Sequence, residues 1–421
     1  MAVTETKEIG APGLPWQRCT LGDFHPFVTS GSRGWARFYS ERGSLFVRIT
    51  NLSRESIYLD LSDQRFVALP ATEREGTRTE VTPGDVLVSI TADIGIIGFA
   101  DEHLPRPAYI NQHIAIVRLP PDRIDSKFVS YYLSAEASQR RFREGTDTGA
   151  KAGMSLGGIR EIQVEFPCLP EQQQISAALS DVDDLLSALD RLIIKQRAIK
   201  TGAMQELLSG RTRLPGFSGE WEEKKIGQFT DCTAGGTPST QIRRYWGGDI
   251  RWMASGELHK KTVQDVEGRI TEDGLRHSSA KLIPAGCVLI GLAGQGKTRG
   301  TVAINRVPLS TNQSIAAIFP ATAFDSKYLY FNLDARYDEL RDLSTGDGGR
   351  GGLNLTIIRN ITVPFPSLQE QEAIATVLSD MDGEIAALEA RRAKTAALKR
   401  GTMQALLTGR VRLPVEEEVA A

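Results

Sequence analysis

One long segment of the chain occurs twice. Residues 169–215 (LPEQQQISAALSDVDDLLSALDRLIIKQRAIKTGAMQELLSGRTRLP) align without a gap to residues 368–414 (LQEQEAIATVLSDMDGEIAALEARRAKTAALKRGTMQALLTGRVRLP), and roughly half of the positions are identical. The offset is 199 residues throughout. A repeat of this length constrains the fold more than any single motif, because two copies of one sequence build the same structure twice.

Each copy has the pattern of a long helix. Pro170 suits a first helical turn, and Gly210 and Gly409 suit C-terminal caps. The pattern predicts two helices of about 40 residues, each about 60 Å long. So narrow an apolar stripe needs a partner, either the other copy in an antiparallel coiled coil or the domain before each helix. Apolar residues recur at spacings of three and four: Ile175, Leu179, Val182, Leu186 and Leu189, then Ile374, Leu378, Met381, Ile385 and Leu388.

The segments before the two helices are weaker copies of each other. Trp16 and Trp221 open them, PGDVLVSI matches PAGCVLIG, INQHIAIV matches TNQSIAAI, and DSKFVSYYL matches DSKYLYFNL. We therefore expect an α+β protein with two mixed α/β domains separated by two long antiparallel helices. Because PGLPW (residues 12–16) opens the first domain and the last helix ends in RLP, we also expect a closed, pseudo-two-fold arrangement with the N-terminus near the end of that helix. The expected boundaries are domain 1–168, helix 169–210, linker 211–221, domain 222–366, helix 367–409 and tail 410–421.

The composition excludes few functions. A chain of 421 residues with 41% hydrophobic residues suggests two to four globular domains, and a net charge of −2 neither requires nor excludes nucleic acid. The four cysteines lie far apart without metal-ligand spacing, and neither a signal sequence nor an apolar run of membrane-spanning length is visible. We expect a reduced, cytoplasmic protein with no metal site and no membrane span.

Residues 291–298 (GLAGQGKT) match the pattern of a phosphate-binding loop. Such a loop requires a helix directly after it, with its positive end toward the phosphates. The residues that follow, RGTVAINRVP, instead predict a strand and a turn, and the equivalent segment of the first half has no G-K-T. A P-loop NTPase is therefore the alternative from another class, and we expect no ATP binding by this chain.

The repeated motifs resemble those of the DNA-specificity subunit of type I restriction-modification systems. The resemblance covers essentially the whole chain and rests on the helix starts LPEQQQI and LQEQEAI, which follow IQVEFP and ITVPFP, and on the helix ends LLSGRTRLP and LLTGRVRLP. The segments AGGTPST and YWGGDIRWMASGEL in the second half, and GDVLVSI with INQ in the first, add to it. A related phage-defence or type IIB methylase-nuclease system is an alternative source of such a subunit.

This resemblance implies a non-catalytic subunit with two target-recognition domains, each of which reads one half of a split site in double-stranded DNA. The helices would act as a spacer and would dock two methyltransferase subunits, to which motor-endonuclease subunits add. S-adenosylmethionine, ATP and Mg²⁺ would belong to those partners, and none of them to this chain. Helices about 60 Å long could hold two domains somewhat more than one turn of DNA, about 34 Å, apart.

Contacts to DNA need donors for phosphates and polar or basic side chains for base edges. The first domain offers such residues in segments 29–39 and 47–52, and the second domain in segments 235–246 and 251–258. The alternative is that these are surface loops with solvated charges. The candidates are Ser32, Arg33, Arg37, Arg48, Thr50 and Asn51, then Thr237, Ser239, Arg243, Arg244, Arg251, Ser255 and Glu257.

Two further features recur or follow from the repeat. Gly-rich loops at 145–154 and 344–353 place Lys151 opposite Arg350 as candidate phosphate contacts, although both loops could be linkers. Lys297 and Arg299 follow a predicted strand and are also candidate DNA contacts.

The pair Asn–Gln occurs at 111–112 and again at 312–313. Its amides could reach adenine, but we favour a structural hydrogen bond in a turn, because direct readers should differ between domains that read different sequences. His113 has no counterpart in the second half, and we interpret it as an incidental residue rather than a catalytic base.

Overall fold

The computed structural model describes residues 15–70, 75–146, 153–294, 296–343 and 352–415. The chain forms two compact units: unit 1 comprises Met1–Asp190 and Ala390–Ala421, and unit 2 comprises Arg191–Glu389. The boundaries between the units fall inside the two long helices. Each unit therefore combines one variable domain with the first half of the helix that follows it and the second half of the other helix.

The first sheets of the two units share the order of their first four strands, and unit 2 adds a fifth strand, β14. β6 and β9 pair antiparallel at the centre of the sheet in unit 1, and β17 and β20 do so in unit 2. In unit 1 the order is β2 (Phe27–Ser30), β9 (Ile114–Arg118), β6 (Val86–Ser89) and β7 (Ile97–Phe99). In unit 2 it is β12 (Cys232–Ala234), β20 (Ile315–Ile318), β17 (Val288–Gly291), β18 (Val302–Asn305) and β14 (Thr262–Val263).

The second sheet of each unit contains one parallel pair, β4 with β8 in unit 1 and β13 with β19 in unit 2. Because the strands of a parallel pair run in the same direction, their carboxyl ends lie at one edge of the sheet. In unit 1 the order is β3 (Tyr39–Ser40), β5 (Phe66–Val67), β4 (Ser44–Val47) and β8 (Ala108–Ile110). In unit 2 it is β15 (Arg269–Ile270), β13 (Trp246–Met253), β19 (Leu309–Thr311) and β16 (Leu282–Ile283).

Short helices and two-stranded ribbons complete each unit. Unit 1 contains β1 (Gln17–Thr20), β10 (Gln163–Phe166), η1 (Leu21–Phe24), η2 (Trp35–Phe38), η3 (Ile49–Asn51), α1 (Glu75–Thr79), α2 (Ser126–Ser134), α3 (Glu136–Thr146) and α4 (Leu156–Arg160). Unit 2 contains β11 (Glu222–Lys225), β21 (Thr362–Phe365), η4 (Arg243–Tyr245), η5 (Ser255–Lys260), α6 (Ile226–Phe229), α7 (Glu272–Arg276), α8 (Ser326–Asp334), α9 (Tyr337–Asp342) and α10 (Leu355–Asn360).

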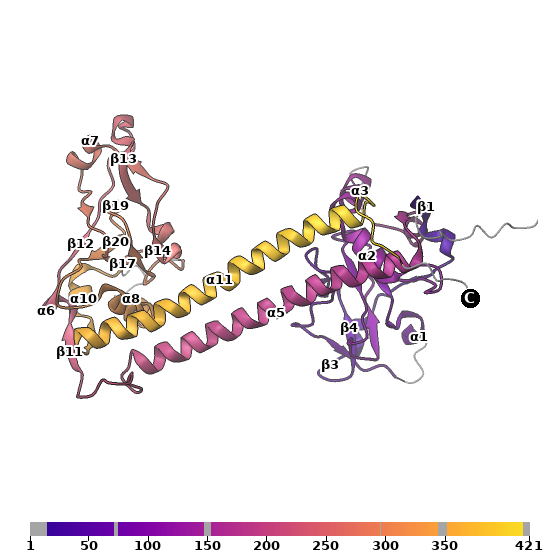
Figure 1. The fold of residues 1–421 in the computed structure, drawn as a ribbon, viewed down its shortest axis with the longest axis horizontal. Coiled ribbons are helices and arrows are strands. Elements are labelled where there is room, and N and C mark those ends of the chain that lie inside the picture. The colour runs from indigo at the N-terminus through magenta and orange to yellow at the C-terminus, as the bar shows by residue number, and fades with distance from the viewer. Residues whose placement is uncertain (1–14, 71–74, 147–152, 295, 344–351, 416–421) are drawn as a thin grey trace, which may run out of the picture. The chain divides into compact units, whose positions relative to one another are not determined.

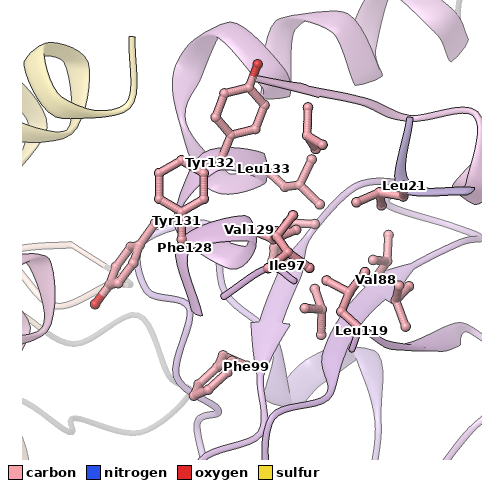
Figure 2. Close-up of a cluster of buried hydrophobic side chains, with 14 of the residues drawn as sticks. Leu21, Val88, Ile97, Phe99, Leu119, Phe128, Val129, Tyr131, Tyr132 and Leu133 are labelled. Atoms are coloured by element: carbon pink, nitrogen blue, oxygen red, sulfur yellow. The ribbon is translucent and has the colours of Figure 1, made fainter. Parts of the chain in front are cut away.

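The main core of unit 1 lies between the first sheet and α2. Figure 2 shows Phe128 and Val129 of α2 with Val88 and Ile97 of the sheet, and all four side chains are buried. α2 lies beside the first turns of α5 in unit 1, and α8 lies beside the first turns of α11 in unit 2 (Figure 1). The motifs DSKF and DSKY begin these two short helices, with Asp125 and Asp325 as N-caps.

The repeated segments form the predicted helices, α5 (Leu169–Leu207) and α11 (Leu368–Leu406), of 39 residues each. They pair antiparallel within each unit: Asp183 of α5 binds Lys399 of α11 in unit 1, and Lys200 binds Asp382 in unit 2. Their stripes also join the domain cores, since Ile175 lies in the unit 1 core. Both expected partners of the stripe, the other helix and the preceding domain, are therefore used.

Both helices end in the predicted glycine caps. Gly210 and Gly409 have φ values of 73° and 68°, which favour glycine. A Cβ atom on either residue would lie 3.1 Å from a tryptophan ring, that of Trp221 at Gly210 and that of Trp16 at Gly409. Trp16, which opens the first domain, thus lies beside the end of the last helix within unit 1.

The GLAGQGKT segment connects two antiparallel strands. It begins at Gly291, the last residue of β17, and the described part of the connection leads to β18, which begins at Val302. β6 and β7 form the equivalent antiparallel pair in unit 1. The prediction of a strand and a turn is confirmed, and the helix that a phosphate-binding loop requires is not present among the described residues 296–305.

Candidate nucleic-acid interface

The Asn–Gln turn, residues 111–114 in unit 1 and 312–315 in unit 2, lies where the carboxyl ends of the parallel strands meet. Three other segments that carry predicted contacts, or adjoin them, bond to it or to its first or last residue through the backbone, and a fourth segment bonds to the third of these. In unit 1 the donors and acceptors are Asn111 N to Val47 O (3.1 Å), Gly31 N to Ile114 O (3.2 Å), Ile90 N to His113 O (2.8 Å) and Met154 N to Ile90 O (2.8 Å). In unit 2 they are Asn312 N to Met253 O (3.0 Å), Gly235 N to Ile315 O (3.3 Å), Leu292 N to Ser314 O (2.8 Å) and Leu353 N to Leu292 O (3.0 Å).

The asparagine of each turn is structural, as predicted. Asn111 Oδ1 accepts a hydrogen bond from His113 N, and Asn312 Oδ1 accepts one from Ser314 N, both at 3.1 Å. These bonds close the turn locally, as Asx turns do. The bonds thereby fix His113 directly before β9 and Ser314 directly before β20.

Glycines allow the neighbouring loop to approach this turn. A Cβ atom on Gly31 would lie 2.2 Å from Asn111 O, and a Cβ atom on Gly235 would lie 2.1 Å from Thr311 O. The glycines in TSGS and AGGT are therefore required by close backbone packing. We define the loops that meet the Asn–Gln turn, together with the turn itself, as the reading edge of each unit.

Several predicted residues of unit 1 are exposed on or beside the reading edge. Arg33 and Thr50 are exposed, and their side chains make no hydrogen bond or ion pair within the described part of the chain. Arg37 is exposed and lies 4.5 Å from the ring centre of Phe38. Ser32 Oγ accepts a hydrogen bond of 2.8 Å from Arg78, a residue that the sequence patterns did not single out.

Two predicted contacts of unit 1 serve the fold instead. The Asn51 side chain is 2% exposed, accepts a hydrogen bond from Arg48 N (2.9 Å) and donates to the carbonyls of Asp60 and Asp63. The Arg48 guanidinium pairs with Asp63 at 2.8 Å. Both side chains hold the chain after β4, and we remove them from the proposed DNA contacts.

In unit 2 two tryptophans fix the loop that contains AGGTPST. Trp252 Nε1 donates to Gly236 O (2.9 Å), Trp246 Nε1 donates to Ser239 O (3.1 Å), and the two rings pack edge to face at 5.0 Å. The Thr237 and Ser239 side chains remain exposed. The loop thus presents hydroxyl groups from a fixed backbone, a use of the tryptophans that the sequence analysis missed.

The predicted arginines of unit 2 differ in whether their side chains have a partner. Arg243 is exposed without a side-chain partner among the described residues. Arg244 pairs with Asp273 at 3.1 Å, and Arg251 pairs with Asp265 at 2.8 Å. The hydrogen bond from Arg251 is the main reason why the pKa of the Asp265 carboxyl is lowered.

Glu257 is a structural residue. Its carboxylate accepts hydrogen bonds from Lys260 Nζ (2.7 Å), Ala254 N (3.2 Å) and Glu267 N (3.2 Å), and we remove it from the proposed contacts. Ser255, at the start of the same short helix, is partly exposed.

Lys297 lies in the β17–β18 connection with its side chain exposed and without a partner in the described residues. Its carbonyl accepts hydrogen bonds from Tyr337 Oη (3.1 Å) and Thr301 Oγ1 (2.5 Å), so its backbone is fixed. Arg299 is partly exposed in the same connection. Lys151 and Arg350 lie outside the described residues.

The described residues offer neither a metal centre nor a membrane segment. Within them, no three His, Cys, Asp or Glu side chains are grouped in a way that could hold a metal ion. None of their helices combines the length and hydropathy needed to cross a bilayer.

Similar proteins are specificity subunits. The chain is 35% identical over 168 residues to the type I restriction enzyme MjaIX specificity subunit of Methanocaldococcus jannaschii, covering 39% of this chain and 38% of that protein. It is 26% identical over 260 residues to the EcoR124I/EcoR124II specificity subunit of Escherichia coli, covering 61% and 63%. The matches thus span less than two thirds of the length of either relative.

The fold is that of a solved S subunit. The type I restriction-modification S subunit from M. genitalium superposes with a TM-score of 0.61 at 15% identity, over 94% of this chain and 97% of the other. A chain from a type I R-M system, solved in work on its complex assembly and conformational transition, gives 0.57 at 16% identity, over 94% and 98%. The family model of the type I restriction modification DNA specificity domain matches residues 76–196 and 218–398. The chain belongs to this family of type I restriction-modification DNA specificity domains, of which it carries two.

Proposed function

We propose that this chain is the DNA-specificity subunit of a type I restriction-modification complex and that its two units read the two halves of a split DNA site. The observation that carries the proposal is the reading edge, which has the same backbone framework in both units and different exposed side chains. Arg33 in unit 1 occupies the place of Thr237 in unit 2, two residues after the equivalent glycine. A constant framework with variable polar side chains suits two domains that bind DNA alike and read different bases.

Methyltransferase subunits are the proposed partners of the long helices. Ile199 on α5 and Leu398 on α11 occupy equivalent positions of the repeat and are 44% and 60% exposed. An exposed aliphatic side chain at the same position in each half supports one docking position per half, hence two methyltransferase subunits per chain. S-adenosylmethionine, ATP and Mg²⁺ would bind to the methyltransferase and motor-endonuclease subunits, and this chain would be non-catalytic.

Docking can be tested by charge substitution. Ile199→Arg or Leu398→Arg should each reduce the complex from two methyltransferase subunits to one, and the double variant should bind none, as measured by light scattering after size exclusion. Thr376→Arg, at an exposed polar position of α11, is the control and should keep both subunits. Two bound subunits in the double variant would contradict the proposed docking positions.

Methylation sequencing tests the central proposal. DNA from cells that express this chain with its methyltransferase subunit should carry methyl groups at one motif with two specified halves and an unspecified gap. The methyltransferase subunit alone is the control and should give no such motif. A single continuous motif, methylation without sequence preference, or ATP turnover by the isolated chain would contradict the proposal.

A further inference from the structure

The two side-chain amides of the Asn–Gln turn have different roles. The asparagine side chain accepts a hydrogen bond from the backbone of the turn, whereas the glutamine side chain, among the described residues, bonds only to another side chain. Gln112 is partly exposed and Gln313 is exposed, at the point where the loops of the reading edge meet. The asparagine therefore has a structural role in the turn, whereas the glutamine occurs at the same place in both units without one.

Each glutamine is held by one end of its amide, and the two units use opposite ends. In unit 2, Thr237 Oγ1 donates to Gln313 Oε1 at 2.5 Å. In unit 1, Gln112 Nε2 donates to His113 Nε2 at 3.0 Å, and His113 Nδ1 bonds to the Thr91 hydroxyl. His113 is therefore part of the device that orients Gln112.

Both glutamine side chains keep at least one unused hydrogen-bond donor and one unused acceptor. A carboxamide has two N–H donors and two acceptor lone pairs. After its bond to Thr237, Gln313 keeps both donors and one lone pair, whereas Gln112, after its bond to His113, keeps one donor and both lone pairs. Each glutamine can still offer one donor and one acceptor side by side, which is the complement of adenine N7 and the N6 amino group in the major groove.

We propose that Gln112 and Gln313 each read an adenine, one in each half of the DNA site, and that His113 and Thr237 are positioning residues for them. This inference rests on the proposed function. A shared reader specifies a base common to both halves, while the side chains that differ between the two reading edges specify the remaining bases. The expectation that direct readers differ between the domains then holds for the loops and fails for this turn.

Base analogues test the contact directly. Methylation sequencing of the wild-type complex first gives the adenines of each half-site. Replacement of the contacted adenine by 7-deazaadenine removes the N7 acceptor, and we expect it to weaken binding by the wild-type complex about 5-fold or more, the lower range for a bidentate base contact. The same analogue should weaken binding by the Gln313→Ala complex less than about 2-fold, because the donor is already absent.

Variants distinguish reading from folding. Gln313→Ala should weaken the preference for adenine at one position of the half-site read by unit 2 and leave the other half-site unchanged. Gln112→Ala should weaken the preference for adenine at one position of the half-site read by unit 1. Gln313→Glu has only acceptors when ionised and should shift the preference at that position toward cytosine, whose N4 is a donor. Thr237→Val should weaken the preference for adenine at the same position, but less than Gln313→Ala does. Gln369→Ala, at an exposed glutamine of α11, is the matched control and should leave the motif intact.

Failure of this inference is distinguishable from failure of the proposed function. If the wild-type complex methylates a bipartite motif, and 7-deazaadenine at every adenine of a half-site weakens wild-type and Gln313→Ala complexes equally, the glutamine does not read adenine and the proposed function stands. An unchanged motif in both alanine variants has the same meaning. Absence of a bipartite motif in the wild type overturns both.

Discussion

The buried ion pair between the long helices in unit 1 allows a quantitative test. Lys399 Nζ lies 2.5 Å from Asp183 Oδ1, and the two side chains are 8% and 7% exposed. The Tyr131 hydroxyl donates to Asp183 at 2.7 Å, and burial, followed by the Asp183 charge, raises the pKa of Tyr131, so that it stays protonated. Lys399→Met removes the cation and leaves a buried carboxylate with Tyr131 as its side-chain donor.

The repeat supplies a matched control in unit 2. Lys200 and Asp382 occupy the equivalent positions at the same distance of 2.5 Å, but their side chains are 16% and 45% exposed. Breaking a buried pair from one side costs about 3–5 kcal/mol, whereas an exposed pair contributes about 0–1 kcal/mol. We therefore expect Lys399→Met to destabilise unit 1 by about 3 kcal/mol and Lys200→Met to destabilise unit 2 by about 1 kcal/mol, because Asp382 can regain water.

Urea unfolding followed by circular dichroism at 222 nm measures both losses. The double variant Lys399→Met/Asp183→Asn should be more stable than Lys399→Met, since the unpaired charge is removed and the amide oxygen can still accept from Tyr131. Equal destabilisation by the two lysine substitutions would refute the reasoning from burial. A double variant that loses the sum of both single losses would refute the proposed coupling.

Three further predictions concern the loop lysine, the glycines and a buried thiol. Lys297→Ala should lower the salt dependence of DNA binding by about one counterion, and Lys297→Arg should preserve it; an unchanged slope in the alanine variant would remove this phosphate contact. Gly401→Ala should stabilise α11 by about 0.5–1 kcal/mol in thermal unfolding, because no atom lies within 4 Å of the added Cβ, whereas Gly235→Ala should destabilise by about 1–3 kcal/mol because of the contact with Thr311 O; effects of the same sign would contradict the packing argument. Burial raises the pKa of the Cys287 thiol to about 12, so iodoacetamide should label it at pH 8 only after unfolding, and its contribution to stability should fall above about pH 9 as the unfolded chain loses a proton that the folded chain keeps. Labelling of native Cys287 at the rate seen in urea would show that the thiol is accessible.

Local patterns predicted much of the fold. The spacing of Ile175, Leu179 and the other stripe residues predicted both long helices, and Gly210 and Gly409 predicted their ends, because helix periodicity and glycine caps depend on residues close in sequence. The residues after GLAGQGKT predicted a strand and a turn for the same reason. These predictions needed no knowledge of distant contacts.

The DNA contacts stay predictions, and the sequence did not distinguish the exposed candidates from the bound ones. Arg33 and Arg243 are exposed, whereas Asn51, Arg48 and Glu257 are bound by their own chain. A sequence motif shows which side chains can donate or accept hydrogen bonds, whereas burial and available partners depend on segments far away in the chain.

The sequence by itself determined that the chain contains two equivalent halves, because the constant offset of the repeat relates every helical position of one half to one in the other. The tertiary structure decided which compact units form, since the antiparallel pairing joins half of each helix to each domain. It also decided which side-chain amide of the Asn–Gln pair is not bound to the backbone of the turn. Asn111 is held by the peptide two residues away, but the approach of Gly31, and with it the reading edge around Gln112, exists only because strands far apart in sequence pair in one sheet.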